Sequence, residues 1–201
     1  MKKIEIKEFG GPEVLEIKNV DIGKPGQNEV LVKNLSIGIN YIDTYHRSGL
    51  YPIPLPSGIG LEACSIIEEV GSEVKLFKVG DRVTRASMPI GTYSEKQIIP
   101  EDKLVKVPDN ISDEVASCIT LKGITAEYLL HRTYQVKKGD KILYHAAAGA
   151  LGQIFCPWAN ALGAEIIGTV GSDEKIEIAK KNGCHHVCLL YTSDAADEVL
   201  G

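Results

Sequence analysis

Long apolar runs are missing from this chain of 201 residues. No segment approaches about 18 consecutive apolar residues, the length that a membrane-spanning helix needs. The first residues, MKKIEIKEFGG, include basic side chains but no apolar stretch of the kind that a secretory signal contains. We therefore expect a cytoplasmic protein with no membrane partner.

Features typical of nucleic-acid or metal binding are also scarce. The net charge is −5, and no block of Lys or Arg could neutralise a run of phosphates, so nucleic acid is not an expected partner. The five cysteines contain no C-x-x-C pair, and we interpret them as small apolar side chains in a reducing compartment. One cluster, Cys184, His185, His186 and Cys188, would suit a metal, but it lacks the second half of a zinc knuckle. We therefore expect no metal.

Residues 1–108 consist of short runs of alternating or β-branched residues. Gly, Pro, Asp and Asn separate these runs, a pattern that predicts strands joined by turns. Gly80 and Asp81 are expected to supply a positive φ in one of the turns. The runs are KIEIKEFG, EVLEIKNV, EVLVKNLSIGIN, CSIIEEVG, DRVTRAS, YSEKQIIP and KLVKVP.

After Pro108 the pattern changes to that of helices. Ser112 is a good N-cap, and Asp113 and Glu114 follow in the first turn, where the helix dipole favours acidic side chains. We expect this helix to be broken or capped near Gly123 and to be followed by a second one. Further along, KILY, HAAAGALG, a helical run and EIIGTV predict one right-handed strand–helix–strand unit. Another helix, DEKIEIAKK, is expected to end at Asn182 and Gly183.

The turn HAAAGALG contains small residues at the places that a dinucleotide-binding turn requires. Ala147, Gly149 and Gly152 occupy the three positions of G-x-G-x-x-G, with Ala in place of the first Gly. Small side chains there let the backbone approach a diphosphate at the start of a helix. Because the turn follows a strand and opens a helix, we interpret it as a dinucleotide site; a purely structural turn is the alternative.

The residues after the second strand of this unit indicate which nucleotide would bind. No acidic residue stands at the tip of the strand, whereas Gly171, Ser172 and Lys175 offer space, a hydroxyl and a cation for a 2′-phosphate. We therefore favour NADPH over NADH. Asp173 and Glu174 weaken this argument, and they can equally be N-terminal charges of the next helix.

Several longer motifs resemble the zinc-independent NADPH:quinone oxidoreductases of the medium-chain dehydrogenase/reductase superfamily. The resemblance implies an α+β protein with a GroES-like β-rich domain at 1–111 and an incomplete Rossmann α/β domain at 112–187. It also implies hydride transfer from NADPH to a quinone, and a homodimeric parent protein. The motifs are GINYIDTYHRSGLYPIPLPSGIGLEACSIIEEVGSEV, GDRV, GTYSE, LKGITAEYLL, HAAAGALGQI and ALGAEIIGTVGS.

The same resemblance assigns the site. Asn40 and Leu61 stand where zinc-dependent relatives have a Cys and a His, so no catalytic metal is implied. Asn40 and Tyr45 are the candidate catalytic residues. An N-cap at Asn40 with aromatic side chains in the core is the alternative, as is plain helix packing for Thr125 and Tyr128. The expected cofactor-binding residues are Tyr41, Ile42, Asp43, Thr44, Tyr45, Thr125, Tyr128, Gly149, Ala150, Leu151, Gly152, Gly171, Ser172 and Lys175.

Three departures from the family pattern stand out. Ala150 replaces the usual second glycine after Gly149, and Pro157 lies inside a predicted helix, which it should kink. The resemblance is expected to stop after Val187, where residues 188–198, CLLYTSDAADE, are the in-frame translation of a DNA sequence that looks like a transposon adapter used in sequencing libraries. We therefore expect 188–201 not to be biological sequence; a genuine loop with a helix start at Asp194 is the alternative.

Other functions remain open at this point. If the tail is foreign, the chain lacks half of a nucleotide-binding fold, and we expect it to be weakly active or inactive alone. Reduction of an enone or enal is the nearest alternative reaction. A non-enzymic NADPH-binding protein and a chaperonin-like interaction module are alternatives of other classes.

Overall fold

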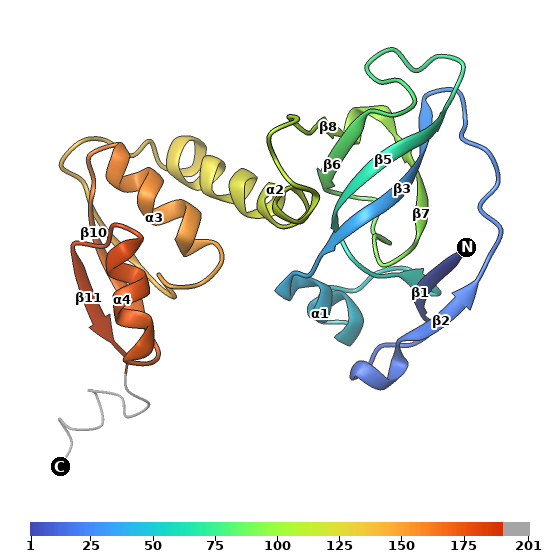
Figure 1. Cartoon of the computed structure of the whole chain (residues 1–201). Coiled ribbons are helices and arrows are strands. Elements are labelled where there is room, and N and C mark those ends of the chain that lie inside the picture. Colours follow the sequence, from blue (N-terminus) through green and yellow to red (C-terminus); the bar gives the residue numbers. More distant parts are fainter. Residues whose placement is uncertain (191–201) are drawn as a thin grey trace. The chain divides into compact units, whose positions relative to one another are not determined.

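The computed structural model describes residues 1–190 and separates the chain into two compact units, Met1–Leu121 and Lys122–Gly201 (Figure 1). We describe each unit by itself. The division falls inside a helix, and the domain limits 1–111 and 112–187 stay predictions. Among the described residues, no helix is both long and apolar enough to cross a membrane.

The first unit is built on two antiparallel sheets, as the alternating runs predict. The larger sheet has the order β7-β3-β5-β6-β8, and the smaller one has the order β2-β1-β4. Gly80 adopts a φ of 88° between β5 and β6, which confirms the expected turn. The strands are β1 (Lys2–Ile6), β2 (Glu16–Asn19), β3 (Glu29–Gly38), β4 (Ser57–Gly58), β5 (Glu62–Val70), β6 (Arg82–Ala86), β7 (Lys96–Pro100) and β8 (Val105–Lys106).

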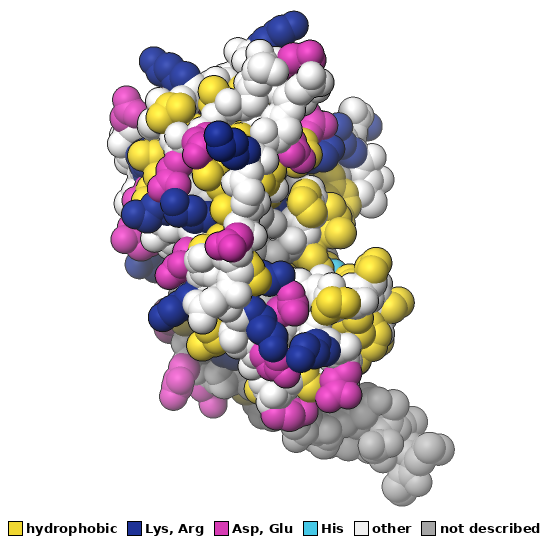
Figure 2. Space-filling view, turned by 90° about the vertical axis from the view of Figure 1, so that its right-hand side faces the viewer, with side chains coloured by type: hydrophobic (Ala, Val, Ile, Leu, Met, Phe, Trp, Pro, Cys, Tyr) yellow, Lys and Arg dark blue, Asp and Glu magenta, His cyan; other side chains and the backbone are white. Residues whose placement is uncertain are grey.

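Inward-facing side chains of the larger sheet form the core of this unit. Val30 and Val32 alternate along β3 and pack with Ile67 of β5, Val83 of β6 and Ile99 of β7. One α-helix, α1 (Tyr41–Ser48), follows β3, and two short 3-10 turns, η1 (Pro12–Val14) and η2 (Glu101–Lys103), complete the unit. On the face seen in Figure 2, basic and acidic side chains are interspersed, and neither sign forms a separate patch.

The long helix α2 (Asp113–Tyr128) begins where the sequence predicts. The hydroxyl of Ser112 accepts a hydrogen bond from the Val115 N–H at 3.3 Å, so Ser112 caps the helix. The expected break at Gly123 is wrong, because α2 runs through it and continues as a π-helical turn, η3 (Leu129–Thr133). A glycine inside a helix costs only about 1 kcal/mol, and its neighbours keep the helix intact.

The second unit contains the predicted strand–helix–strand pattern. Three parallel strands lie in the order β11-β10-β9, and a helix follows each of the first two along the chain. Gly183 has a φ of 90° and ends α4 beside Asn182, as expected. The elements are β9 (Lys141–Tyr144), α3 (Gly152–Ala161), β10 (Glu165–Val170), α4 (Glu174–Lys181) and β11 (His186–Leu189).

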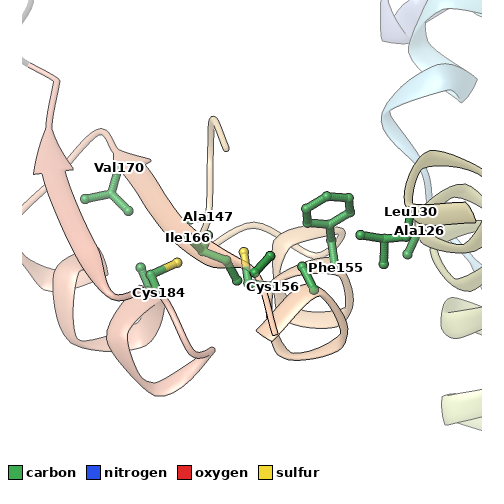
Figure 3. Close-up of a cluster of buried hydrophobic side chains, with 11 residues drawn as sticks. Ala126, Leu130, Ala147, Phe155, Cys156, Ile166, Val170 and Cys184 are labelled. Carbon is green, nitrogen blue, oxygen red and sulfur yellow. The ribbon is translucent and has the colours of Figure 1, made fainter. Parts of the chain in front are cut away.

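A single apolar cluster fills the second unit (Figure 3). Ala126 and Leu130 pack there with Phe155 of α3 and Ile166 of β10. The ring of Phe155 stacks on that of Tyr144, with centroids 4.4 Å apart. The sheet and its connecting helices are therefore held by one continuous core.

Two departures noted in the sequence have structural counterparts. Pro157 lies inside α3 with its ring exposed, and the helix retains its helical assignment from Gly152 to Ala161. Cys188 lies in β11, where it pairs with Thr169 of β10. Residues 191–201, including Asp194, lie outside the described residues, so the foreign origin of 188–201 stays a prediction.

Candidate functional site

The turn between β9 and α3 is fixed to the rest of the second unit by its backbone. The N–H of Ala147 donates to the Thr169 carbonyl of β10 at 3.0 Å, and the Asn182 side chain donates to the Ala147 carbonyl at 3.2 Å. Ala147 itself is buried in the cluster of Figure 3. The start of the turn therefore cannot shift without disturbing both a strand and the end of α4.

Close packing explains the glycines of this turn. A Cβ at Gly152 would overlap the Ala147 carbonyl oxygen and lie 2.7 Å from its carbonyl carbon. A Cβ at Gly149 would lie 3.0 Å from the Ala146 carbonyl oxygen, a tight but smaller conflict. Ala150 has no positive φ and is exposed, so its methyl group fits where the family usually has glycine.

Backbone strain is also located at this turn. Ala146 has a φ of 56°, in the left-handed region that L-residues other than Asn and Asp rarely adopt. Such conformations cost about 1–3 kcal/mol and are held in place by the surrounding structure. Ala146 is exposed, and the bond from the Gly149 N–H to its carbonyl, 2.8 Å, closes the turn directly before α3.

The turn presents unbonded amides to a ligand. Gln153 and Phe155 donate to the carbonyls of Gly149 and Leu151, at 3.0 and 2.8 Å. Within residues 1–190, no backbone carbonyl accepts a hydrogen bond from the N–H groups of Ala150, Leu151 or Gly152. Three successive amides at the start of a helix of ten residues could donate hydrogen bonds to an anion such as a dinucleotide diphosphate.

The segment expected to bind the adenosine end lies at the same edge of the sheet. β9 and β10 are parallel neighbours, so the turn after Tyr144 and the segment after Val170 leave the sheet on one side. Nothing lies within 4 Å of the position that a Cβ would take at Gly171, which leaves open space. Ser172 is half-buried and Lys175 exposed, and the Lys175 N–H donates to the Ser172 carbonyl at 3.1 Å.

The second group of candidate residues surrounds the start of α1 in the first unit. Asn40 is the N-cap of α1, with extended backbone angles, and its role in a reaction stays a prediction. Its N–H donates to Asp43 Oδ2 at 2.9 Å, and its side-chain Nδ2 donates to Glu62 Oε2, also at 2.9 Å. Asn40 is therefore held through both its backbone and its amide.

The carboxylate of Asp43 is hydrogen-bonded to other groups of the protein. The residue is 4% exposed, and besides Asn40 it accepts a hydrogen bond from the Tyr93 hydroxyl at 2.8 Å. Burial raises the pKa of Asp43 above its usual range and also raises that of Tyr93. Asp43 Oδ1 and His46 Nδ1 are buried without a hydrogen-bond partner among the residues described. These contacts give Asp43 a part in holding Asn40.

Sequence reasoning missed Glu62. Its carboxylate is fully buried, and Oε1 accepts a hydrogen bond from the Leu121 N–H of α2 at 2.8 Å. The one available signal was the acidic residue next to Leu61 in an otherwise apolar segment, GLEA.

Three tyrosine rings, two on α1 and one shortly after it, form a row. The ring centroids of Tyr41 and Tyr45 are 5.3 Å apart, and those of Tyr45 and Tyr51 are 5.2 Å apart. Tyr41 is 76% exposed and Tyr51 is 51% exposed, so the expectation of aromatic side chains in the core is wrong for Tyr41. Exposed aromatic rings in contact with one another suit a flat organic ligand.

The remaining candidate residues lie on helices α1 and α2 and are half-buried or exposed. Ile42 and Thr44 are half-buried on α1, and the Thr44 hydroxyl donates to the Tyr41 carbonyl at 2.7 Å. On α2, Thr125 is half-buried and Tyr128 is exposed. The structure thus brings residues 40–45 together in the first unit, and 149–152 with 171–175 in the second.

The side chains that most often bind metals are scattered in the part of the chain that the structure describes. Within it, no three His, Cys, Asp or Glu side chains lie close enough together to hold an ion. His185 Nδ1 instead accepts a hydrogen bond from the Ile166 N–H at 3.0 Å. His186 lies 3.0 Å from Glu165 Oε1, and Cys184 is buried in the core. Of the two residues that the resemblance compares with zinc ligands, Asn40 is bonded to Glu62, and Leu61 has no group that could bind a metal.

Comparisons with known families agree with both units. Residues 26–109 match the family described as "Alcohol dehydrogenase GroES-like domain", and residues 150–200 match "Zinc-binding dehydrogenase". The second match continues past Val187, where we expected the resemblance to end. Together they confirm an α+β fold with a GroES-like part followed by a Rossmann-like part.

Individual relatives are similar over nearly the whole chain. A quinone oxidoreductase of Pseudomonas aeruginosa is 52% identical over 183 residues, which cover 90% of this chain and 56% of that protein. A 2-haloacrylate reductase of Burkholderia is 46% identical, with coverage of 96% and 60%. The crystal structure of Escherichia coli quinone oxidoreductase with NADPH superposes with a TM-score of 0.92 at 48% identity, covering 100% of this chain and 61% of that one.

The chain therefore spans about three fifths of the length of the relatives it matches. Within that span, the resemblance includes both the turn before α3 and the start of α1. The chain belongs to the medium-chain dehydrogenase/reductase superfamily, and several of the relatives that it resembles over this span are named quinone oxidoreductases.

Proposed function

We propose that the protein containing this chain reduces quinones with NADPH by hydride transfer and without a metal. One observation carries the proposal: three unbonded amides, of Ala150, Leu151 and Gly152, at the start of α3 in a turn too tight for larger side chains. Relatives named quinone oxidoreductase, one of them solved with NADPH, support the same assignment.

In this proposal the second unit binds the cofactor, which supplies a hydride when bound. The three amides donate hydrogen bonds to its diphosphate. Ser172 and Lys175 bind a 2′-phosphate, for which the open space at Gly171 leaves room. We also assign Thr125 and Tyr128 of α2 to this site, as the resemblance implies.

The first unit binds the acceptor. We assign the exposed rings of Tyr41 and Tyr51 to the flat face of a quinone, and the Tyr45 hydroxyl to one of its oxygens as a hydrogen-bond donor. Asn40, held by Glu62, fixes the position of the reacting groups. A hydride and a proton convert a quinone to a hydroquinone, and water supplies the proton, so no buried general acid is required.

Reduction of an activated carbon–carbon double bond is the second candidate. The 46% identical 2-haloacrylate reductase supports it. A haloacrylate is small and has no ring to stack on tyrosine, so the exposed row Tyr41, Tyr45 and Tyr51 favours a quinone.

Steady-state kinetics of the intact protein test the proposal. With NADPH, turnover should be faster with quinones than with 2-haloacrylates or enals, and NADH should be a poor substitute. A strong preference for enals or haloacrylates would replace quinone reduction with the second candidate. Tight NADPH binding with no turnover of any acceptor would indicate a non-enzymic protein.

We also propose, from the same resemblance, that the intact protein is a homodimer, and we retain the cytoplasm as its location. The 201-residue chain alone is proposed to be weakly active or inactive, while its cofactor turn still binds NADPH. Size-exclusion chromatography with light scattering on the intact protein tests the dimer.

A further inference from the structure

One buried carboxylate holds the side chain of Asn40. Glu62 Oε2 accepts a hydrogen bond from Asn40 Nδ2 at 2.9 Å, and Oε1 of the same group accepts one from the Leu121 N–H at 2.8 Å. These bonds connect the start of α1, strand β5 and helix α2. A carboxylate only accepts hydrogen bonds, so the amide nitrogen of Asn40 faces Glu62 and its oxygen faces away.

The fold makes room for this carboxylate. Gly38, at the end of β3, is the register partner of Glu62 on β5. A Cβ at Gly38 would lie 3.0 Å from Glu62 Oε2 and would overlap the Ser117 carbonyl oxygen of α2. The glycine thus lets both the carboxylate and the helix approach the start of α1.

A second carboxylate holds the backbone of Asn40. Asp43 Oδ2 accepts hydrogen bonds from the Asn40 N–H at 2.9 Å and from the Tyr93 hydroxyl at 2.8 Å. Burial is the main cause of the raised pKa of Asp43, and the charge of Glu62 contributes to it. Asp43 is the N3 residue of α1, so its bond to the Asn40 N–H is the acidic half of a capping box. Such a box needs neither the Tyr93 hydroxyl on Asp43 nor the Glu62 carboxylate on the Asn40 side chain, and burying acidic groups is costly.

We propose that Glu62 and Asp43 are positioning residues that fix the orientation of Asn40 for the reaction, with Tyr93 acting through Asp43. The inference rests on the proposed function, in which Asn40 faces the reacting groups. It adds three residues that neither the sequence motifs nor the family resemblance singled out for this role.

The first experiment compares Glu62→Gln with Glu68→Gln in the intact protein. Asn40 and Leu121 donate to different oxygens of Glu62, and glutamine has an NH₂ group in place of one of them, so it leaves one of the two donors without its acceptor. We expect Glu62→Gln to lower kcat for quinone about 10- to 100-fold, the effect of a misplaced active-site group, with the Kd for NADPH changed less than about twofold. Glu68 lies on the same strand but pairs with Lys96 at 2.6 Å near the surface, so Glu68→Gln should behave like the wild type.

A conservative pair tests Asp43. The oxygen of an asparagine can accept both bonds that Asp43 Oδ2 accepts, so Asp43→Asn should lower kcat much less than Asp43→Ala does. Loss of kcat in Asp43→Asn to the level of Asp43→Ala would show that the charge itself is needed and would overturn a positioning role for Asp43.

Hydrogen exchange separates this inference from the proposed function. In the 201-residue chain, NMR should show that the side-chain amide protons of Asn40 exchange slowly with solvent. This exchange should be at least about tenfold faster in Glu62→Gln and should be unchanged in Glu68→Gln. If the intact wild type reduces no quinone, the proposed function fails and this measurement alone decides whether Glu62 holds Asn40. An unchanged exchange rate in Glu62→Gln would overturn the inference. It would also be overturned if Glu62→Gln lost kcat, NADPH affinity and thermal stability to the same extent, because that result would indicate a general structural role.

Discussion

Replacing Gly152 by alanine tests whether the turn before α3 is shaped for a diphosphate. The added Cβ would lie 2.7 Å from the Ala147 carbonyl carbon, and ordinary contact begins at 3.4 Å. Ala147 cannot yield easily, because it is buried and bonded to Thr169 and Asn182. The start of α3 must therefore move away by about 0.7 Å or more, and its free amides move with it.

The expected magnitude follows from the bonds that this movement breaks. A hydrogen bond to a charged group contributes about 1.5–3 kcal/mol, so misplacing one amide should weaken NADPH binding roughly 10- to 150-fold. Overpacking at the same place should lower the free energy of unfolding by about 1–3 kcal/mol. Both effects should appear together, because one displacement causes them.

Isothermal titration calorimetry of the 201-residue chain with NADPH measures the first effect, and urea unfolding measures the second. Gly123→Ala is the matched control, because nothing lies within 4 Å of a Cβ there and the site is inside α2. That control should gain about 1 kcal/mol of stability and bind NADPH as the wild type does. Unchanged NADPH affinity and stability in Gly152→Ala would refute the tight-turn argument.

Four further changes test other parts of the structure. Pro157→Ala should raise the free energy of unfolding in urea by about 3 kcal/mol, because it restores a hydrogen bond inside α3; a loss of stability would contradict this. Lys175→Gln should weaken NADPH binding about tenfold in calorimetry and leave NADH binding unchanged, whereas equal losses would remove Lys175 from the phosphate site. Chelators should change neither the Tm nor the activity of the intact protein, and inactivation restored by zinc would contradict the metal-free assignment. Burial raises the pKa of Asp43 in the folded protein above its value in the unfolded chain, so the wild type should lose stability as the pH rises through the folded-state pKa. In urea unfolding, Asp43→Asn should not show this loss, and identical pH profiles of the two proteins would refute the prediction.

Features that depend on neighbouring residues were predictable from the sequence. Ser112 and Asn40 cap helices because a short polar side chain precedes a helical run, and Gly80 and Gly183 adopt positive φ values where turns require them. The strand–helix–strand order of the second unit follows from periodicity in the same way. These predictions needed no knowledge of distant contacts.

Features that depend on distant residues were not predictable. Glu62 acts on Asn40 from 22 positions away and on Leu121 from 59 positions away, and Tyr93 reaches Asp43 across 50 positions. The register of the sheet brings these residues together, and no periodicity or spacing in the sequence reveals that register. The expected break at Gly123 failed for a related reason, because tertiary packing overrides a weak local preference.

The alanine that replaces the first glycine of the dinucleotide pattern has a structural explanation of the same kind. A Cβ at Gly168 of β10 would lie 2.7 Å from the Ala147 Cβ and 2.7 Å from the Cys184 sulfur. The methyl group of Ala147 therefore occupies space that Gly168 leaves open on the adjacent strand. Because Gly168 of β10 has no side chain, Ala147 fits beside this strand and its N–H keeps the bond to the Thr169 carbonyl. A sequence pattern that counts glycines only inside the turn undervalues this site, since one of the required small residues lies on the next strand.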